Sequence, residues 1–162
     1  MAQAAPFLAM AGVQMAGGIL QAGAIKQQGK YAEQQANFNA RMADLQAEDA
    51  IRRGDKTASD VRKRGSQVRG SQRAALAGQG VDVGFGSAMD LQDETTYLTN
   101  LDVLDAKNNA WRESFGYRVQ ATNYRLEGKY AMALARQNAK MTILNAGLGA
   151  AQTGMSYMGS RK

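Results

Sequence analysis

The sequence predicts an all-α protein: a long antiparallel helical hairpin with an apolar helical arm at each end of the chain, assembling into a ring-like oligomer. Two observations predict the hairpin. Proline occurs once in the 162 residues, at Pro6, so no other proline interrupts a helix. Apolar residues recur three and four positions apart on both sides of one glycine-rich stretch. The oligomer is expected because a single pair of helices buries too little apolar surface to be stable alone.

Five segments follow from composition. They are an apolar arm rich in Gly and Ala at residues 1–26, a long amphipathic helix at 27–78, a connection at 79–86, a second long helix at 87–140, and a C-terminal apolar arm with a basic end at 141–162. The connection falls in the stretch "GQGVDVGFGS", whose four glycines are typical of a turn.

Large apolar side chains are expected to form the contact between the two helices. On the first helix they are Tyr31, Phe38, Met42 and Leu45, and on the second they are Tyr97, Leu101, Leu104, Trp111 and Phe115. Asn108 occupies the missing position of the second row and is expected to fix the register of the pair. Gly54, Gly65 and Gly70 lie in the first helix, where each is expected to cost about 1 kcal/mol relative to alanine.

The hairpin predicts which residues face each other. If the chain folds back near residue 83, the numbers of opposing residues add up to roughly 166, which places Arg53 opposite Glu113, Arg64 opposite Asp102 and Asp60 near Lys107. Exposed pairs of this kind contribute little to stability, so they inform the topology more than the energy. The same fold brings the two arms together.

The two arms carry no charged side chain from residue 1 to 25 or from 141 to 160. Each is long enough to cross a hydrocarbon core of about 30 Å as a helix, and Lys26 and Lys140 lie where basic residues reach lipid headgroups. Small residues four apart, such as Gly18 and Ala22, allow close helix packing. The residues expected to contact a membrane are Phe7, Leu8, Val13, Ile19, Leu20, Ile25, Ile143, Leu144, Leu148, Met155 and Tyr157. In the alternative, both arms pack only on protein inside a soluble oligomer.

Glutamines recur every seven residues through the first arm, beginning with Gln14 and Gln21. This spacing puts them on one helix face. A polar seam or a solvated face is the favoured interpretation, and lining of a wet lumen in a ring of copies is the alternative.

The formal charge of +6 favours anionic partners. The stretch "RKRGSQVRGSQR" contains five basic residues and no acid, which suits contact with DNA phosphates without reading of base sequence. These residues are Arg62, Lys63, Arg64, Arg69 and Arg73. Nonspecific double-stranded DNA is therefore a possible partner, and an ion-paired or solvated helix face is the alternative.

Cysteine and histidine are both absent, which removes disulfides, thiolate nucleophiles, Cys/His zinc sites and the Ser-His-Asp triad. Acidic pairs such as Asp93 with Glu94 fall on a long helix with no sign of a pocket. No catalytic residue, metal site or cofactor is expected.

Two stretches, "QRAALAGQGVDVGFGSAMD" at residues 72–90 and "NNAWRESFGYRVQATNYR" at residues 108–125, carry a family resemblance. Over roughly residues 60–136 the chain resembles internal virion proteins of short-tailed bacteriophages, the small ejection proteins packed in the capsid near the portal. The two apolar arms lie outside the matching motif.

The resemblance implies a non-enzymatic virion protein that leaves the particle with the genome and oligomerises into a channel across the host envelope, at the outer membrane. It implies other ejection proteins, the portal and a lipid bilayer as partners, and a location first inside the virion and then in the host outer membrane and periplasm. The competing interpretation is a soluble scaffold or connector subunit of a phage head or tail that enters no membrane.

Overall fold

The computed structural model describes the backbone of residues 5–159 and the side chains of residues 12–153 and 155. Within that range the chain forms two helices, α1 (Ala5–Gly78) and α2 (Ser87–Gly159). Pro6 lies in the first turn of α1. Backbone N–H groups in a first turn have no acceptor within the helix, so a proline there removes no helical hydrogen bond. Neither helix is interrupted at residue 26 or 140, so each expected arm continues the long helix beside it.

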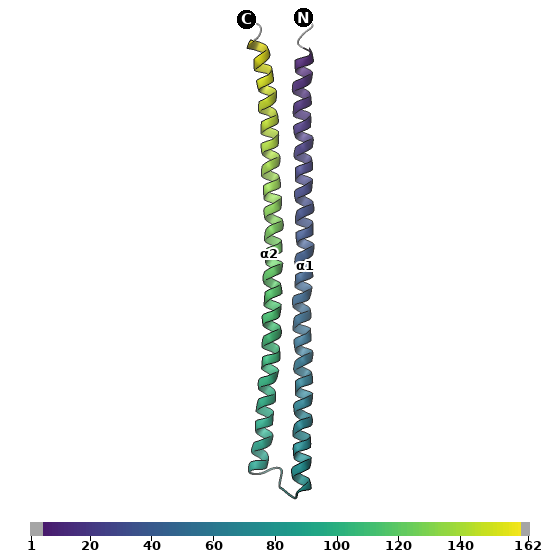
Figure 1. Ribbon diagram of the computed structural model, residues 1–162, viewed down its shortest axis with the longest axis vertical. Helices are drawn as coiled ribbons and strands as arrows, with labels where there is room; N and C mark the ends of the chain where they lie inside the picture. The colour runs from purple at the N-terminus through teal and green to yellow at the C-terminus, as the bar shows by residue number, and fades with distance from the viewer. Residues whose placement is uncertain (1–4, 160–162) are drawn as a thin grey trace. The chain divides into compact units, whose positions relative to one another are not determined.

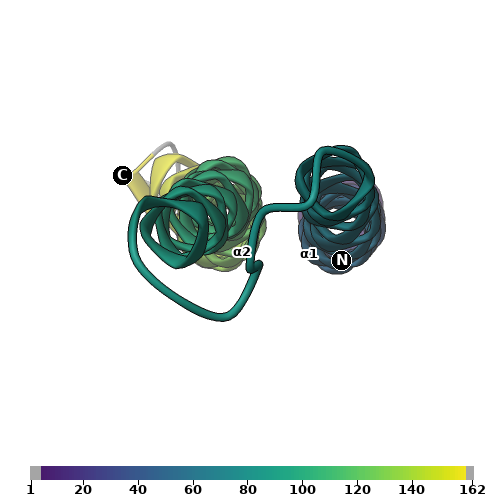
Figure 2. The same cartoon turned by 90° about the horizontal axis from the view of Figure 1, so that it is seen from below.

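Residues 79–86 connect the helices, as their glycine content predicts. Gly80 and Gly86 have φ angles of 76° and 62°, in the left-handed region that glycine adopts without strain. The Leu76 carbonyl accepts the N–H of Val81 at 3.1 Å, and the Gly86 carbonyl accepts the N–H of Asp90 at 3.1 Å in the first turn of α2. The Asp90 carboxylate also lies at the positive end of the α2 dipole. The turn from α1 into α2 is seen end-on in Figure 2.

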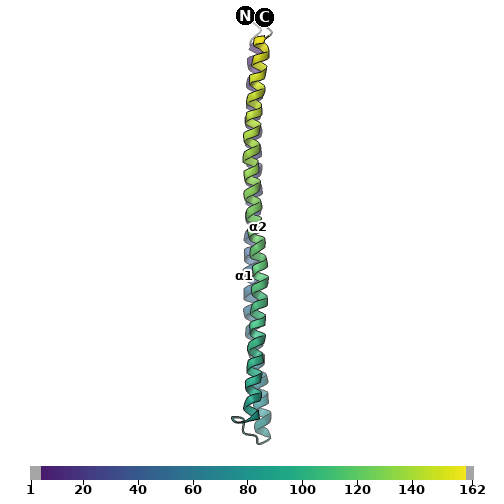
Figure 3. The same ribbon diagram turned by 90° about the vertical axis from the view of Figure 1, so that its left-hand side faces the viewer.

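The chain divides into two compact units. Unit 1 comprises residues 1–40 and 122–162, and unit 2 comprises residues 41–121 with the connection. In each unit a segment of α1 runs antiparallel to a segment of α2, side by side (Figure 1). Viewed from the side, the α1 segment of each unit lies largely behind its α2 segment (Figure 3). This agrees with the predicted helical hairpin.

Small side chains form the contact between the helices in both units. Those buried in unit 1 include Gly18, Ala22, Gly29, Ala40, Gly128, Ala135 and Ala139, and those in unit 2 include Ala43, Ala47, Ala50, Gly54, Ala58, Ala110, Ser114 and Ala121. We call these fifteen residues the small-residue seam. Successive members on one helix are mostly three, four or seven positions apart, the spacing of one helix face. Gly18 and Ala22, the small residues singled out in the first arm, are both buried in unit 1.

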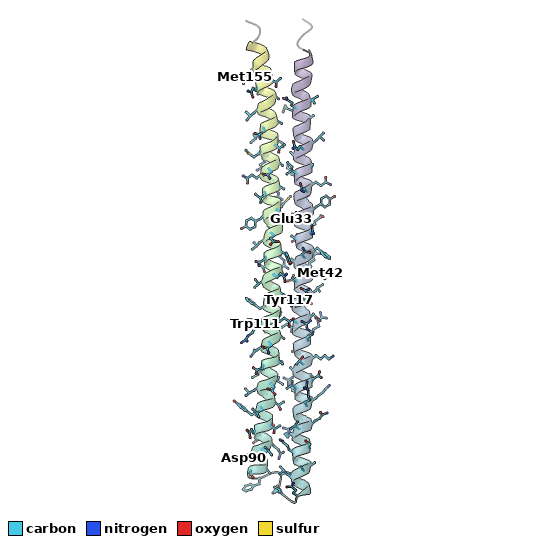
Figure 4. The ribbon with its side chains drawn as sticks, in the orientation of Figure 1. Glu33, Met42, Asp90, Trp111, Tyr117 and Met155 are labelled. Carbon is cyan, nitrogen blue, oxygen red and sulfur yellow. The ribbon has the colours of Figure 1, made fainter. Side chains whose placement is uncertain are left out.

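The prediction that large apolar residues form this contact is wrong. Trp111 is 60% exposed, and Phe115, Tyr97, Phe38 and Leu45 are exposed as well. Side chains project from both helices on the sides away from the seam, Trp111 among them (Figure 4). These large residues repeat with the same period as the seam but occupy another face. Val103 and Met132 are the larger apolar side chains that are buried with the small residues of the described part of the chain. Asn108 is exposed with them and does not enter the seam.

The register of the hairpin agrees with the prediction to within two residue numbers. Gly18 faces Ala146 and Gly29 faces Ala135 in unit 1, while Gly54 faces Ala110 in unit 2. The two numbers of each pair add up to 164. Arg53 donates to Glu113 at 2.6 Å, as predicted. Lys107, predicted near Asp60, lies 3.9 Å from Asp55.

Glycine in the seam has a packing role that the sequence did not reveal. A Cβ atom built at Gly18, Gly29 or Gly54 would overlap the Cβ of the alanine it faces, and one built at Gly65 would overlap Thr99. At Gly128 the same atom would lie 2.9 Å from the Cβ of Ala36. Gly70, by contrast, has nothing within 4 Å. Gly70 therefore only lowers helix propensity relative to alanine, as expected for all three glycines of α1. Gly54 and Gly65 also allow the two helices to approach each other closely.

We predict opposite effects for two Gly-to-Ala substitutions in α1. Gly54→Ala should destabilise the hairpin by about 1–3 kcal/mol, because the new methyl group overlaps Ala110 in a seam with no room to relax. Gly70→Ala should stabilise it by up to about 1 kcal/mol, since it adds helix propensity in open space. Chemical unfolding followed by circular dichroism measures both. Equal stabilisation by the two substitutions would contradict the seam.

Candidate functional site

A row of large apolar side chains on α2 is the first candidate surface. It consists of Tyr97, Leu101, Leu104, Trp111 and Phe115, all exposed and all in unit 2, and we call it the α2 stripe. The rings of Trp111 and Phe115 stack with centroids 5.6 Å apart. Large exposed apolar patches mark interaction sites in soluble proteins, so the stripe is a candidate interaction surface.

The residues predicted to contact a membrane are largely exposed where their side chains are described. Leu20 is 76% exposed, Ile25 is partly buried, and the other exposed members are Val13, Ile19, Ile143, Leu144, Leu148 and Met155. Phe7, Leu8 and Tyr157 lie outside the described side chains. Within the described residues, neither helix contains a stretch long and apolar enough to cross a membrane.

Gln14 and Gln21 lie along a groove between the two helix segments of unit 1. The groove has a volume of about 610 Å³, and α2 contributes Thr142 and Asn145 to it among other residues. Both glutamines are exposed, so they form a polar edge beside the small-residue seam.

The predicted DNA-contacting residues, Arg62, Lys63, Arg64, Arg69 and Arg73, are all exposed on α1 of unit 2. Arg69 donates to the hydroxyl of Thr96 at 3.2 Å. Arg64 and Asp102 line the same groove, as the register predicts. Acidic side chains of α2 therefore share this surface with the basic residues.

The net charge is confined to unit 1. Unit 2 contains twelve Lys and Arg and twelve Asp and Glu, so its formal charge is zero. Unit 1 contains eight Lys and Arg but only two acids, Glu33 and Glu127, so it carries the whole formal charge of +6. Residues 1–32 and 128–162 contain no acid at all. An anionic partner of this protein is thus attracted to unit 1 in the first place.

Four of these cations gather at one groove of about 690 Å³ between α1 and α2 of unit 1. Its lining consists of Gly23, Lys26, Gln27, Lys30, Tyr31, Gln34, Met132, Arg136 and Lys140. We call it the basic groove. No carboxylate lines it, and no ion pair among the described residues involves any of its four cations.

Sequence reasoning singled out Lys26 and Lys140 as the ends of the arms but missed Lys30 and Arg136. The signal was present in the register, because Lys26 with Lys140 and Lys30 with Arg136 each add up to 166. The predicted register was used only to pair opposite charges. Used for like charges as well, it would have placed all four cations together.

Other chemistry has little support in the described part of the chain. No group of three or more His, Cys, Asp or Glu residues there is arranged to hold a metal ion. No protein-family model matches the chain, and searches of curated proteins and of solved structures found no significant match.

We predict that Arg136→Glu raises the melting temperature of the protein at low ionic strength, by about 1–3 °C. The substitution replaces a repulsion across the basic groove by an attraction to Lys30 and Lys140. Thermal unfolding followed by circular dichroism gives the shift, which added salt should shrink because these groups are exposed. A lower melting temperature at low salt would mean that the four cations do not repel one another.

Proposed function

We propose that this protein is a non-enzymatic structural subunit that associates side by side with copies of itself. The α2 stripe is the observation that supports this proposal. Burying a large apolar side chain contributes about 1.5–3 kcal/mol, and the stripe offers five of them in one row. The seam inside the hairpin is already filled by small residues, so only another molecule can cover the stripe.

A second copy is the partner that fits best. Met42 and Leu45 form another exposed apolar face, on α1 of the same unit. Unit 2 carries no net charge, so two copies do not repel each other there. An apolar face on each of the two helices allows every copy to contact two neighbours, which is what a closed ring requires.

We predict that replacing Trp111 and Phe115 together by serine weakens self-association at least about tenfold, since two large apolar side chains are lost from the contact. Sedimentation velocity over a range of protein concentrations measures the association. Helix content should stay unchanged because neither residue enters the small-residue seam. Asn109→Ser and Asn123→Ser, two exposed polar changes on α2 outside the row of the stripe, are the matched control. Unchanged association of the Trp111/Phe115 variant would overturn the proposal.

The finer proposal follows the resemblance to phage ejection proteins. We propose that the assembly is a virion component that leaves with the genome and forms a channel across the host outer membrane for DNA delivery. The exposed aliphatic side chains of the uncharged arms support membrane contact, and the exposed Arg62–Arg73 stretch supports nonspecific contact with passing DNA. A soluble scaffold or connector is the second candidate, favoured by the same α2 stripe, because protein alone can cover it.

Dye release from liposomes separates these two candidates. We predict that the full chain releases an encapsulated dye and that Leu20→Ser with Leu144→Ser reduces release several-fold, because two exposed aliphatic side chains leave the arms. Gln28→Ser with Asn138→Ser is the polar control. Intact oligomers that release no dye would favour the scaffold.

A further inference from the structure

The basic groove of unit 1 has no assigned partner. We propose that it binds the phosphate of an anionic phospholipid headgroup, with Lys26, Lys30, Arg136 and Lys140 as the ligating cations. This inference rests on the membrane part of the proposed function and not on self-association.

Charge is the first argument. Two cations from each helix face one groove, and no carboxylate lines it. In unit 2, two basic residues that face the other helix have acids within reach, since Arg53 has Glu113 and Lys107 has Asp55. An uncompensated cluster of like charges is unfavourable unless an anion occupies it, and phosphate oxygens accept hydrogen bonds from both ammonium and guanidinium groups.

The other lining residues suit a headgroup. Gln27 donates to the Tyr31 hydroxyl at 3.3 Å, which leaves that hydroxyl free to donate in turn. Gln34 adds an amide to the lining. These groups are able to bind the ester oxygens or the hydroxyls of a polar headgroup beside its phosphate.

The size of the groove favours a lipid headgroup over duplex DNA. Its lining on α1 runs from Gly23 to Gln34, which is about 16 Å of helix. A volume of about 690 Å³ is in the range of sites for single small molecules. A protein that follows a duplex spreads its cations along several phosphates, whereas these four line a single groove.

The neighbours of the groove favour a membrane surface. Ile19 precedes Lys26 by seven residues on α1, and Leu144 follows Lys140 by four on α2, so each pair shares one helix face. Both aliphatic side chains are exposed. Unit 1 therefore presents cations next to aliphatic side chains on both helices. This arrangement matches a phospholipid, in which an anionic headgroup is followed by acyl chains.

Co-flotation of the full-length protein with vesicles tests the proposal. One set of vesicles contains phosphatidylcholine with phosphatidylglycerol, and the other contains phosphatidylcholine alone. The groove variant replaces Lys26, Lys30, Arg136 and Lys140 by glutamine. The matched control replaces Arg41, Arg52, Lys56 and Arg112, four exposed cations of unit 2, by glutamine and so changes the net charge equally.

We expect binding to the anionic vesicles that falls at least about 100-fold in the groove variant and less than about threefold in the control. Circular dichroism should show equal helix content in both variants. Replacing Lys26, Lys30 and Lys140 by arginine, which keeps the charge, should retain binding.

Several results would overturn the proposal. Equal losses in the groove variant and the control would mean that net charge alone attracts the vesicles. Binding of inorganic phosphate without binding of vesicles would assign the groove to a free anion. A groove variant that loses affinity for duplex DNA but not for vesicles would assign it to nucleic acid. If the wild-type chain releases dye but binds both kinds of vesicle equally, the groove inference fails while the membrane function stands.

Discussion

The close approach of α1 and α2 is the constraint on which the rest of this structure depends. At pairs such as Gly54 with Ala110, the contact leaves no room for one more methyl group. Small side chains bury little area each, so the pair relies on many weak contacts between backbone and side-chain atoms along the seam. Most of the large apolar residues lie on the outer surface of the hairpin instead, those of the α2 stripe among them.

The same constraint acts on the charges. Because the seam is narrow and filled by small side chains, charged side chains lie outside it, and those at its edges can reach the other helix. Unit 2 contains equal numbers of basic and acidic residues, and a bond such as Arg53 to Glu113 joins its two helices. In unit 1 both helices bring cations, and Lys30 and Arg136 line one groove. Units 1 and 2 are thus both antiparallel helix pairs, but they differ in net charge.

Much of the fold was predictable from the sequence, because its causes are local. A single proline and a cluster of glycines determine where helices run and where the chain turns, and the turn fixes which residues face each other.

The side chains that form the contact between the helices were not predictable by the same rule. Large apolar residues with helical spacing are expected to face the nearest partner, but this rule does not say whether that partner is the same chain. Alanines such as Ala43 and Ala47 have the same spacing, yet alanine is so common in helices that the row carries little signal. The basic groove was hidden for another reason: the register was used to find attractive pairs, and it places repulsive ones equally well.

The uniformity of the small-residue seam bears on how such a protein varies in length. Contacts of nearly the same shape recur about every three turns, from Gly54 with Ala110 to Gly65 with Thr99. Removal of eleven residues from α1 and of the eleven that face them on α2 would bring equivalent small side chains together again and leave the connection untouched. Insertion of matched eleven-residue segments would lengthen the pair in the same way. A change in one helix alone would instead shift every contact beyond it. Natural variation in such a chain is thus expected to occur as paired insertions and deletions at mirrored distances from the turn.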